Sequence, residues 1–292
     1  MSIKHKMIQS VIVTIKNNKD GSYRTQADRR RSLIHIAKTL HQLGYKLDSL
    51  RSMKQRHIVV LVQHWQQQGD GAGSIKNRMS HLRWLMTKFN KPNVIPNNDQ
   101  LGIAKRVYVN HCDKSRTLSE TDLNALRDPL MRHSLKAQQL FGLRLEESLK
   151  IQPYVADAGD SLYIKSSWAK GGRARRIPIL TETQRTWLAE AKQLVQHKSH
   201  SMIPADTTYK TYRKRFEKSC ERAGIDHRHG LRHLYAQNRY RTLTGWSSPV
   251  KGGPNKKNLS QAQQSIDRSA RLQISSELGH SRLSVTDIYC GQ

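Results

Sequence analysis

The sequence predicts a mainly α-helical protein of two domains, with one small antiparallel β-sheet in the second domain. Apolar residues recur at helical spacing along most of the chain. A Pro- and Asn-rich stretch, KPNVIPNND, interrupts this pattern after residue 90. Further on, the turn WAKGGRA joins two strand-like runs, SLYIKSS and RRIPIL, and this arrangement is typical of a hairpin.

The first domain is expected to be a helical bundle over residues 25–110. Residues 1–24 are predicted to form an N-terminal arm or short strand, because the β-branched run VIVTI precedes the turn-forming residues NNKDGS. The helices predicted from apolar spacing cover about 25–43, 54–68 and 74–90. The segment that follows, to about residue 116, is interpreted as a linker.

The second domain is expected over residues 117–292. Ser119 and Asp122 have the spacing of a capping box, which marks the start of its first helix. The helices predicted there cover about 120–127, 133–142, 145–151, 181–197 and 207–223, with further helix after His229. Residues 243–271 begin with many Gly, Pro, Ser and Lys residues and are interpreted as a basic loop insertion.

The charge of the chain predicts a polyanionic partner. The sequence has 51 Lys and Arg against 22 Asp and Glu, a formal net charge of +29. Residues 1–110 contribute 20 basic and five acidic residues, so the excess is shared by both halves. A basic surface on each domain is expected of a protein that binds nucleic acid with both of them.

Other signals in the sequence are weak. No apolar run reaches the roughly 18 residues of a membrane span, and the apolar stretch near the N-terminus is too short for a signal peptide. The three cysteines, Cys112, Cys220 and Cys290, lie far apart and indicate neither a disulfide framework nor a metal site. A cytoplasmic location without membrane contact is therefore expected.

Four short stretches carry residues suited to chemistry. They are FGLRLEES with Arg144 and Glu147, WAKGGRARRIPI with Lys170, HRHGLRHLYAQ with His229 and Arg232, and LGHSRLSVTDIY with His280 and Tyr289. Each has an ordinary explanation when taken alone, such as a solvated ion pair, a basic turn or a packed terminal tyrosine. The histidines near residue 229 have no carboxylate or cysteine at ligand spacing, so no metal site and no cofactor are expected.

Together and in this order, the four stretches resemble the boxes of the tyrosine recombinases, the phage-integrase family. GLRLEE resembles the first arginine box, KGGRARRIP the lysine hairpin, HGLRH the H-x-L-R-H box, and LGH followed by Tyr289 the final box. The resemblance covers about residues 117–292, and the helical domain before it fits the family's SAM-like core-binding domain. This chain departs from the family in the long gap of 48 residues between Arg232 and His280 and in its short tail.

The resemblance implies a role for each residue of the set. Arg144 and Arg232 would bind the phosphate oxygens, because guanidinium groups are planar and permanently charged. Tyr289 would attack phosphorus to form a 3′-phosphotyrosyl link, and Lys170 would protonate the departing 5′-oxygen. His229 is expected to act as base or proton relay and His280 as a hydrogen-bond donor to the phosphate.

Glu147 is expected to support the arginines or histidines without reacting itself. Residues expected to contact DNA lie on the exposed side of the third helix and in the hairpin turn. They are Lys76, Arg78, Arg83, Lys88, Arg173 and Arg175.

The function expected from the resemblance is site-specific DNA recombination or integration, for a mobile element in a bacterium. The expected partners are double-stranded DNA at a specific site and, on that DNA, three further copies of the chain. Only three residues follow Tyr289, so no tail helix could dock into a neighbour, and a monomer is expected without DNA. Two alternatives remain at this point: a type IB topoisomerase-like relaxing enzyme and a DNA-binding protein without activity.

Overall fold

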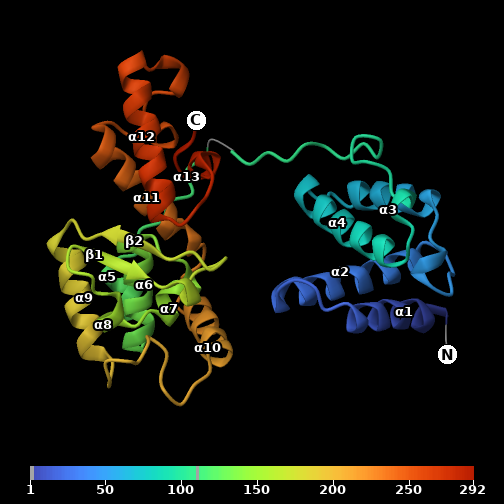
Figure 1. The fold of residues 1–292 in the computed structure, drawn as a ribbon, viewed down its shortest axis with the longest axis horizontal. Coiled ribbons are helices and arrows are strands. Elements are labelled where there is room, and N and C mark those ends of the chain that lie inside the picture. Colours follow the sequence, from blue (N-terminus) through green and yellow to red (C-terminus); the bar gives the residue numbers. More distant parts are fainter. Residues whose placement is uncertain (1–2, 110–111) are drawn as a thin grey trace. The chain divides into compact units, whose positions relative to one another are not determined.

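The computed structural model describes residues 3–109 and 112–292, which divide into two compact units between residues 107 and 108. Most of the described residues are helical, and the sheet found among them is two-stranded and antiparallel (Figure 1). The predicted fold class is therefore confirmed. None of the helices in the described ranges combines the length and apolar character that a bilayer crossing requires.

The N-terminal unit is a small helical bundle. Its elements are α1 (Ile3–Asn17), α2 (Tyr23–Gln42), η1 (Leu50–Ser52), α3 (Gln55–Gln67), α4 (Ala72–Lys88) and η2 (Pro92–Val94). The apolar positions that predicted its helices, such as Leu33, Leu61 and Leu82, are fully buried in one core. Helical spacing therefore located the elements because each helix buries one apolar face.

The predicted N-terminal arm or strand is wrong, because residues 3–17 form helix α1. Met7, Val11 and Ile15 recur every four residues, and all three are buried in the core of the N-terminal unit. Helix α1 packs against α2. The β-branched run VIVTI favours a strand when read alone, but burial of one helical face outweighs that local preference. The bundle thus begins at α1, ahead of the expected boundary at residue 25.

The C-terminal unit packs helices around a hairpin. Its elements are α5 (Glu120–Asn124), α6 (Pro129–Phe141), α7 (Leu145–Lys150), α8 (Pro153–Ala156), β1 (Ser161–Ile164), η3 (Ser166–Trp168), β2 (Arg175–Pro178), α9 (Glu182–Leu194), α10 (Tyr209–Arg222), α11 (His229–Thr244), η4 (Pro249–Lys251), η5 (Lys256–Asn258), α12 (Gln261–Glu277), η6 (Leu283–Val285) and α13 (Thr286–Cys290). Helix α11 contacts α6, α12 and α13 and so lies at the centre of this unit.

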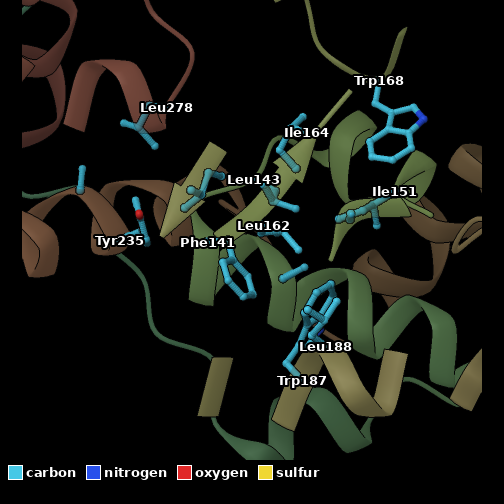
Figure 2. Packing of buried hydrophobic residues seen from close by; sticks show 14 of the residues in the cluster. Phe141, Leu143, Ile151, Leu162, Ile164, Trp168, Trp187, Leu188, Tyr235 and Leu278 are labelled. Atoms are coloured by element: carbon cyan, nitrogen blue, oxygen red, sulfur yellow. The ribbon is translucent and has the colours of Figure 1, made fainter. Parts of the chain in front are cut away.

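The main core of the C-terminal unit lies between the hairpin and the helices α6 and α9. Leu162 of β1 pairs with Ile177 of β2, and both side chains are fully buried. Phe141 and Trp187 meet edge to face with their ring centroids 5.2 Å apart, and Trp187 Nε1 donates to the His133 carbonyl over 3.0 Å. Figure 2 shows Leu162, Phe141 and Trp187 in this core. This core fixes the end of α6, from which the candidate site begins.

The predicted loop insertion at 243–271 is only partly a loop. It contains the short turns η4 and η5, and from Gln261 onward it is helix α12. Ser260 caps this helix in a capping box with Gln263. The buried positions of α12 include the charged residues Asp267 and Arg271, which pair with each other. A helical face built partly from buried charges gives little apolar periodicity, which explains why the sequence pattern missed it.

Candidate active site

The turn between α6 and α7 sets the first arginine in place. Gly142 ends α6 in the left-handed conformation with φ 61°, and a Cβ on it would lie 2.6 Å from the Tyr235 ring. Only glycine fits both conditions. Arg144 then caps α7, and its backbone N–H donates to Glu147 Oε2 over 2.8 Å. The sequence FGLRLEE therefore forms a tight turn that fixes Arg144 and Glu147 together.

Glu147 is a fully buried carboxylate held by two arginines. It accepts hydrogen bonds from Arg144 Nη1 at 2.9 Å and from Arg175 Nη1 and Nη2 at 3.0 and 2.7 Å. Burial acts to raise the pKa of Glu147, but the hydrogen bonds and charge of Arg175, followed by those of Arg144, outweigh it and lower the pKa. Glu147 therefore stays ionised and fixes both guanidinium groups.

Arg232 lies in the first turn of α11 and is 1% exposed. Its Nε donates to Tyr289 Oη over 3.2 Å, and its Nη2 donates to His280 Nε2 over 3.1 Å. It also donates to the carbonyl oxygens of Gly142 and Leu278. Burial lowers the pKa of Arg232 to about 10, so the group remains charged at neutral pH. Four of its five N–H groups are thus used, and one on Nη1 is left for a ligand oxygen.

Tyr289 is 4% exposed and lies on the one-turn helix α13. Its hydroxyl lies between Arg232 Nε at 3.2 Å and His280 Nε2 at 3.3 Å. Its ring packs beside the buried His233, with the ring centroids 4.7 Å apart. Tyr289 is therefore held against the arginine by contacts within the same chain.

The position of Arg232 fixes the tautomer of His280. Because a guanidinium can only donate, His280 Nε2 must be the unprotonated nitrogen in this arrangement. The Tyr289 hydroxyl, which accepts from Arg232, lies 3.3 Å from the same nitrogen, so any hydrogen bond that it donates there shares the single lone pair of Nε2 with Arg232. Burial, with the charges of Arg232 and Arg144, lowers the pKa of His280 to about 3. His280 is thus a neutral group within reach of the phenolic proton, and its expected role as a hydrogen-bond donor to the phosphate stays a prediction.

The expected base, His229, lies farther from the tyrosine oxygen. It begins α11, is exposed, and its ring centroid is 6.0 Å from that of Tyr289. Partial burial, Arg232 and Arg144 lower the pKa of His229. His233 lies between it and the core, and burial lowers the pKa of His233 to about 4. The imidazoles around Tyr289 are thus neutral at pH 7 beside two charged arginines.

Lys170 is the member of the predicted set that the structure keeps apart. It lies exposed in the turn between η3 and β2, followed by Gly171 and Gly172, which both have positive φ. Within the described residues no hydrogen bond or ion pair to Lys170 is found. The structure therefore clusters Arg144, His229, Arg232, His280 and Tyr289, and leaves Lys170 at the tip of the hairpin.

Two of the residues expected to contact DNA are engaged inside the N-terminal unit. Arg78 pairs with Asp70 at 2.5 Å and stacks over Trp65. Arg83 donates to Asn98 Oδ1 over 2.9 Å and also to a backbone carbonyl of the same segment. These contacts anchor α4 and the chain that follows it, and the DNA contacts expected of Arg78 and Arg83 stay a prediction.

Arg175 differs from these two, since it is buried against Glu147 and its Nε donates to the Glu277 carbonyl over 2.7 Å, so its expected position in an exposed turn is wrong. It points inward because it lies two residues before the buried Ile177 on β2, and residues two apart on a strand share one face. Lys88 and Arg173 are exposed, and Lys76 is half-buried. These three side chains remain available to a phosphate backbone.

Two residues that the sequence analysis did not assign belong to the site. His233 packs on the Tyr289 ring, and Gln237 Nε2 donates to the Tyr289 carbonyl over 3.1 Å. With His229 they recur every four residues on one face of α11. That spacing was visible in the sequence, but polar residues on a buried face are easily taken for a solvated one. Across the described parts of the chain, no cluster of His, Cys, Asp and Glu is arranged to hold a metal ion.

Two family models match the chain. The model described as phage integrase, N-terminal, matches residues 5–94, and the model described as integrase matches residues 117–238. The second match contains Arg144, Lys170, His229 and Arg232 and ends before His280 and Tyr289. The comparison with curated proteins found no match.

Solved integrase structures share the fold over nearly the whole chain. A fragment of lambda integrase, in a dimer bound to a COC′ core site, is 16% identical with a TM-score of 0.59, covering 94% of this chain and 91% of that chain. A longer lambda integrase dimer on the same site is 14% identical with a TM-score of 0.63, covering 96% and 76%. The integrase of transposon Tn1549, in complex with circular intermediate DNA, is 13% identical with a TM-score of 0.54, covering 100% and 96%.

Proposed function

The chain belongs to the phage-integrase family of tyrosine recombinases, and from this premise we propose that Tyr289 is the nucleophile with which it cuts and rejoins DNA. The enzyme is a site-specific recombinase. One observation carries the assignment of Tyr289. Its hydroxyl lies within hydrogen-bond reach of both an arginine and a histidine.

The arginines supply charge to the phosphate in this proposal. Attack on a phosphodiester builds negative charge on the non-bridging oxygens in the transition state. Arg144, held by Glu147, and the remaining Nη1 hydrogen of Arg232 would donate to those oxygens. Since both groups are already fixed by hydrogen bonds, little reorganisation is needed when the phosphate arrives.

Protons move at two atoms in the proposed reaction. The phenol of Tyr289 loses its proton as it attacks phosphorus, and His280 Nε2 lies 3.3 Å from the hydroxyl to accept it. The bond to the 5′-oxygen then breaks, and that oxygen needs a proton. Lys170 is exposed on the hairpin turn and could reach a bound DNA strand to provide one. The phosphotyrosyl bond retains the energy needed to rejoin the strand.

We further propose double-stranded DNA at a specific site as the partner, with a tetramer assembling on it. The formal charge of +29 supports DNA binding. The lambda integrase relatives were solved as a dimer bound to a core site and as a tetramer bound to a Holliday junction. A mobile element as the source of the chain is supported by the likeness to a transposon integrase.

Tyr289→Phe tests the proposal, because it removes one oxygen and keeps the ring. The wild-type protein is expected to form a DNA adduct that survives denaturant when incubated, in EDTA, with nicked DNA from the ends of its element. The Phe variant should bind this DNA normally and form no adduct. Tyr154→Phe, which alters a partly exposed tyrosine on α8, is the matched control and should behave as wild type. An adduct formed by Tyr289→Phe would refute the assignment.

The Tyr289→Phe experiment also tests Cys290, the neighbouring residue that could act as a nucleophile. Cys290 is buried, and burial raises the pKa of its thiol to about 12, so it is poorly suited to form a thiolate at neutral pH. A protein whose wild type forms no adduct on any DNA of the element would instead be a DNA-binding relic of the family.

A further inference from the structure

The segment that leads into the C-terminal unit, residues 112–118, lies on helix α11. Arg116 N–H donates to the Gly230 carbonyl over 3.1 Å. A Cβ on Gly230 would lie 2.6 Å from the Lys114 carbonyl oxygen, so any larger residue would push the segment away. Gly230, the second residue of α11, thus allows this connecting segment to pack directly on the helix that carries Arg232.

Asp113 in this segment binds two elements that are distant in sequence. Its Oδ1 accepts from Gln237 Nε2 over 2.9 Å, and its Oδ2 accepts from Lys251 Nζ over 2.6 Å. Ser115 donates to the same carboxylate from its backbone N–H and its hydroxyl. Partial burial acts to raise the pKa of Asp113, but the hydrogen bonds from Lys251, Ser115 and Gln237 outweigh it and hold the pKa well below its usual range. The carboxylate is therefore ionised and fully engaged.

Gln237 connects Asp113 to the nucleophile helix. Its side chain is buried, and its Nε2 donates both to Asp113 and to the Tyr289 carbonyl over 3.1 Å. Its Oε1 is buried without a hydrogen-bond partner among the described residues. Rotating the amide would place Oε1 against two acceptor oxygens, so the two bonds to Nε2 determine its orientation.

Lys251 connects Asp113 to the other side of α13. It ends the turn η4, which packs against α13. A Cβ on Gly291 would lie 2.9 Å from Val250 Cγ1. Arg271 completes this side by donating to the Gly291 carbonyl over 2.8 Å. Helix α13 is thus held between α11 and η4, and Asp113 bonds to both.

We propose that Asp113 is a positioning residue, which holds α13 and with it Tyr289 in the attacking position by bridging Gln237 and Lys251. A helix of five residues is not stable alone, so its position depends on the contacts around it. A displacement of about 1 Å at a reacting atom can slow a reaction by about a hundredfold. The inference rests on the proposed role of Tyr289, but the docking of α13 can be measured without DNA.

The test compares Asp113→Ala, Asp113→Glu and Lys251→Met with a control, Asp157→Ala. Asp157 directly follows α8 and pairs with Lys192 of α9 at 2.5 Å, and its side chain is 25% exposed against 30% for Asp113. Hydrogen exchange of residues 283–292 is measured without DNA. Adduct formation in a single turnover on saturating nicked DNA, DNA affinity and thermal unfolding are measured in parallel.

Asp113→Ala is expected to speed exchange in α13 and to slow adduct formation about tenfold, with DNA affinity unchanged. Asp113→Glu should recover much of the rate. Lys251→Met added to Asp113→Ala should cost little more, since both changes break one bridge. Unchanged exchange and rate in Asp113→Ala would overturn the proposal, as would an equal loss in Asp157→Ala. If the wild type forms no adduct, the proposed function fails, but exchange in α13 still decides the role of Asp113.

Discussion

Glu147→Gln is expected to destabilise the C-terminal unit far more than Arg144→Gln does, although Glu147 pairs with Arg144. The substitution keeps the size and shape of the side chain and removes its charge. Arg175, whose side chain is 5% exposed, would then be a buried cation without its carboxylate. Breaking a buried ion pair from one side costs about 3 to 5 kcal/mol. For a domain of this size that corresponds to a fall of about 6 to 20 °C in Tm.

Arg144→Gln is the informative comparison. The Arg144 side chain is 21% exposed, and after its loss Glu147 still pairs with Arg175 at 2.7 Å. The expected cost is therefore only about 1 to 2 kcal/mol, the value of a partly exposed charged hydrogen bond. Adduct formation should nevertheless be abolished, because Arg144 is the proposed phosphate ligand.

Differential scanning calorimetry can compare the two variants, because both substitutions lie in the C-terminal unit and should shift the transition of that unit alone. The expected order of Tm is wild type, then Arg144→Gln, then Glu147→Gln. If Arg144→Gln lowered Tm as much as Glu147→Gln, Arg175 would not depend on this carboxylate, and the reasoning would be refuted. A Glu147→Gln protein within about 1 kcal/mol of wild type would refute it equally.

Two further predictions concern proton transfer and acid stability. Lys170→Ala is expected to slow adduct formation on ordinary DNA by about 10² to 10⁴-fold, and a 5′-phosphorothiolate, whose sulfur leaves without a proton, should restore most of the rate; no rescue would exclude Lys170 as the proton donor. The pKa of His233 is lowered to about 4 in the folded protein, so acid protonates the unfolded chain first and stability is lost as pH falls below about 6.5. In denaturant titrations, titration of His233 is expected to account for about 2 to 3 kcal/mol of the fall in unfolding free energy between pH 7 and pH 4.5, so in His233→Gln that fall should be smaller by this amount. An unchanged pH dependence would contradict the burial of a neutral imidazole.

The sequence was sufficient for the fold class because the helices and strands bury regular apolar faces. It failed at α1, where a β-branched run suggested a strand although Met7, Val11 and Ile15 share a helical face. It failed again at α12, whose buried positions include Asp267 and Arg271. In both cases the deciding contacts come from other elements, so local preference could not reveal them.

The candidate site was predictable where a short box fixes its own geometry. The turn FGLRLEE places Arg144 and Glu147 by local hydrogen bonds alone. Arg175 was misassigned because a basic run suggests a solvated surface, although its position two residues before Ile177 already placed both side chains on the same face of the strand. Gln237 and Asp113 were not found, because they meet only when segments 124 positions apart pack together. Such contacts depend on the tertiary fold.

The arrangement of charge explains why the tyrosine is docked before any substrate is present. Arg144, Arg175 and Arg232 face one buried carboxylate, Glu147, so the centre of the site has an excess of positive charge. Burial, followed by the charges of Arg232 and Arg144, keeps the neighbouring His280 neutral, and only a neutral imidazole can accept a hydrogen bond from Tyr289. An arriving phosphate would reduce the excess and favour protonation of His280, at the stage when the phenol must lose its proton. Burial and the arginine charges therefore keep His280 neutral beside Tyr289 in the free protein, and in the proposed mechanism a bound phosphate would make His280 a better proton acceptor.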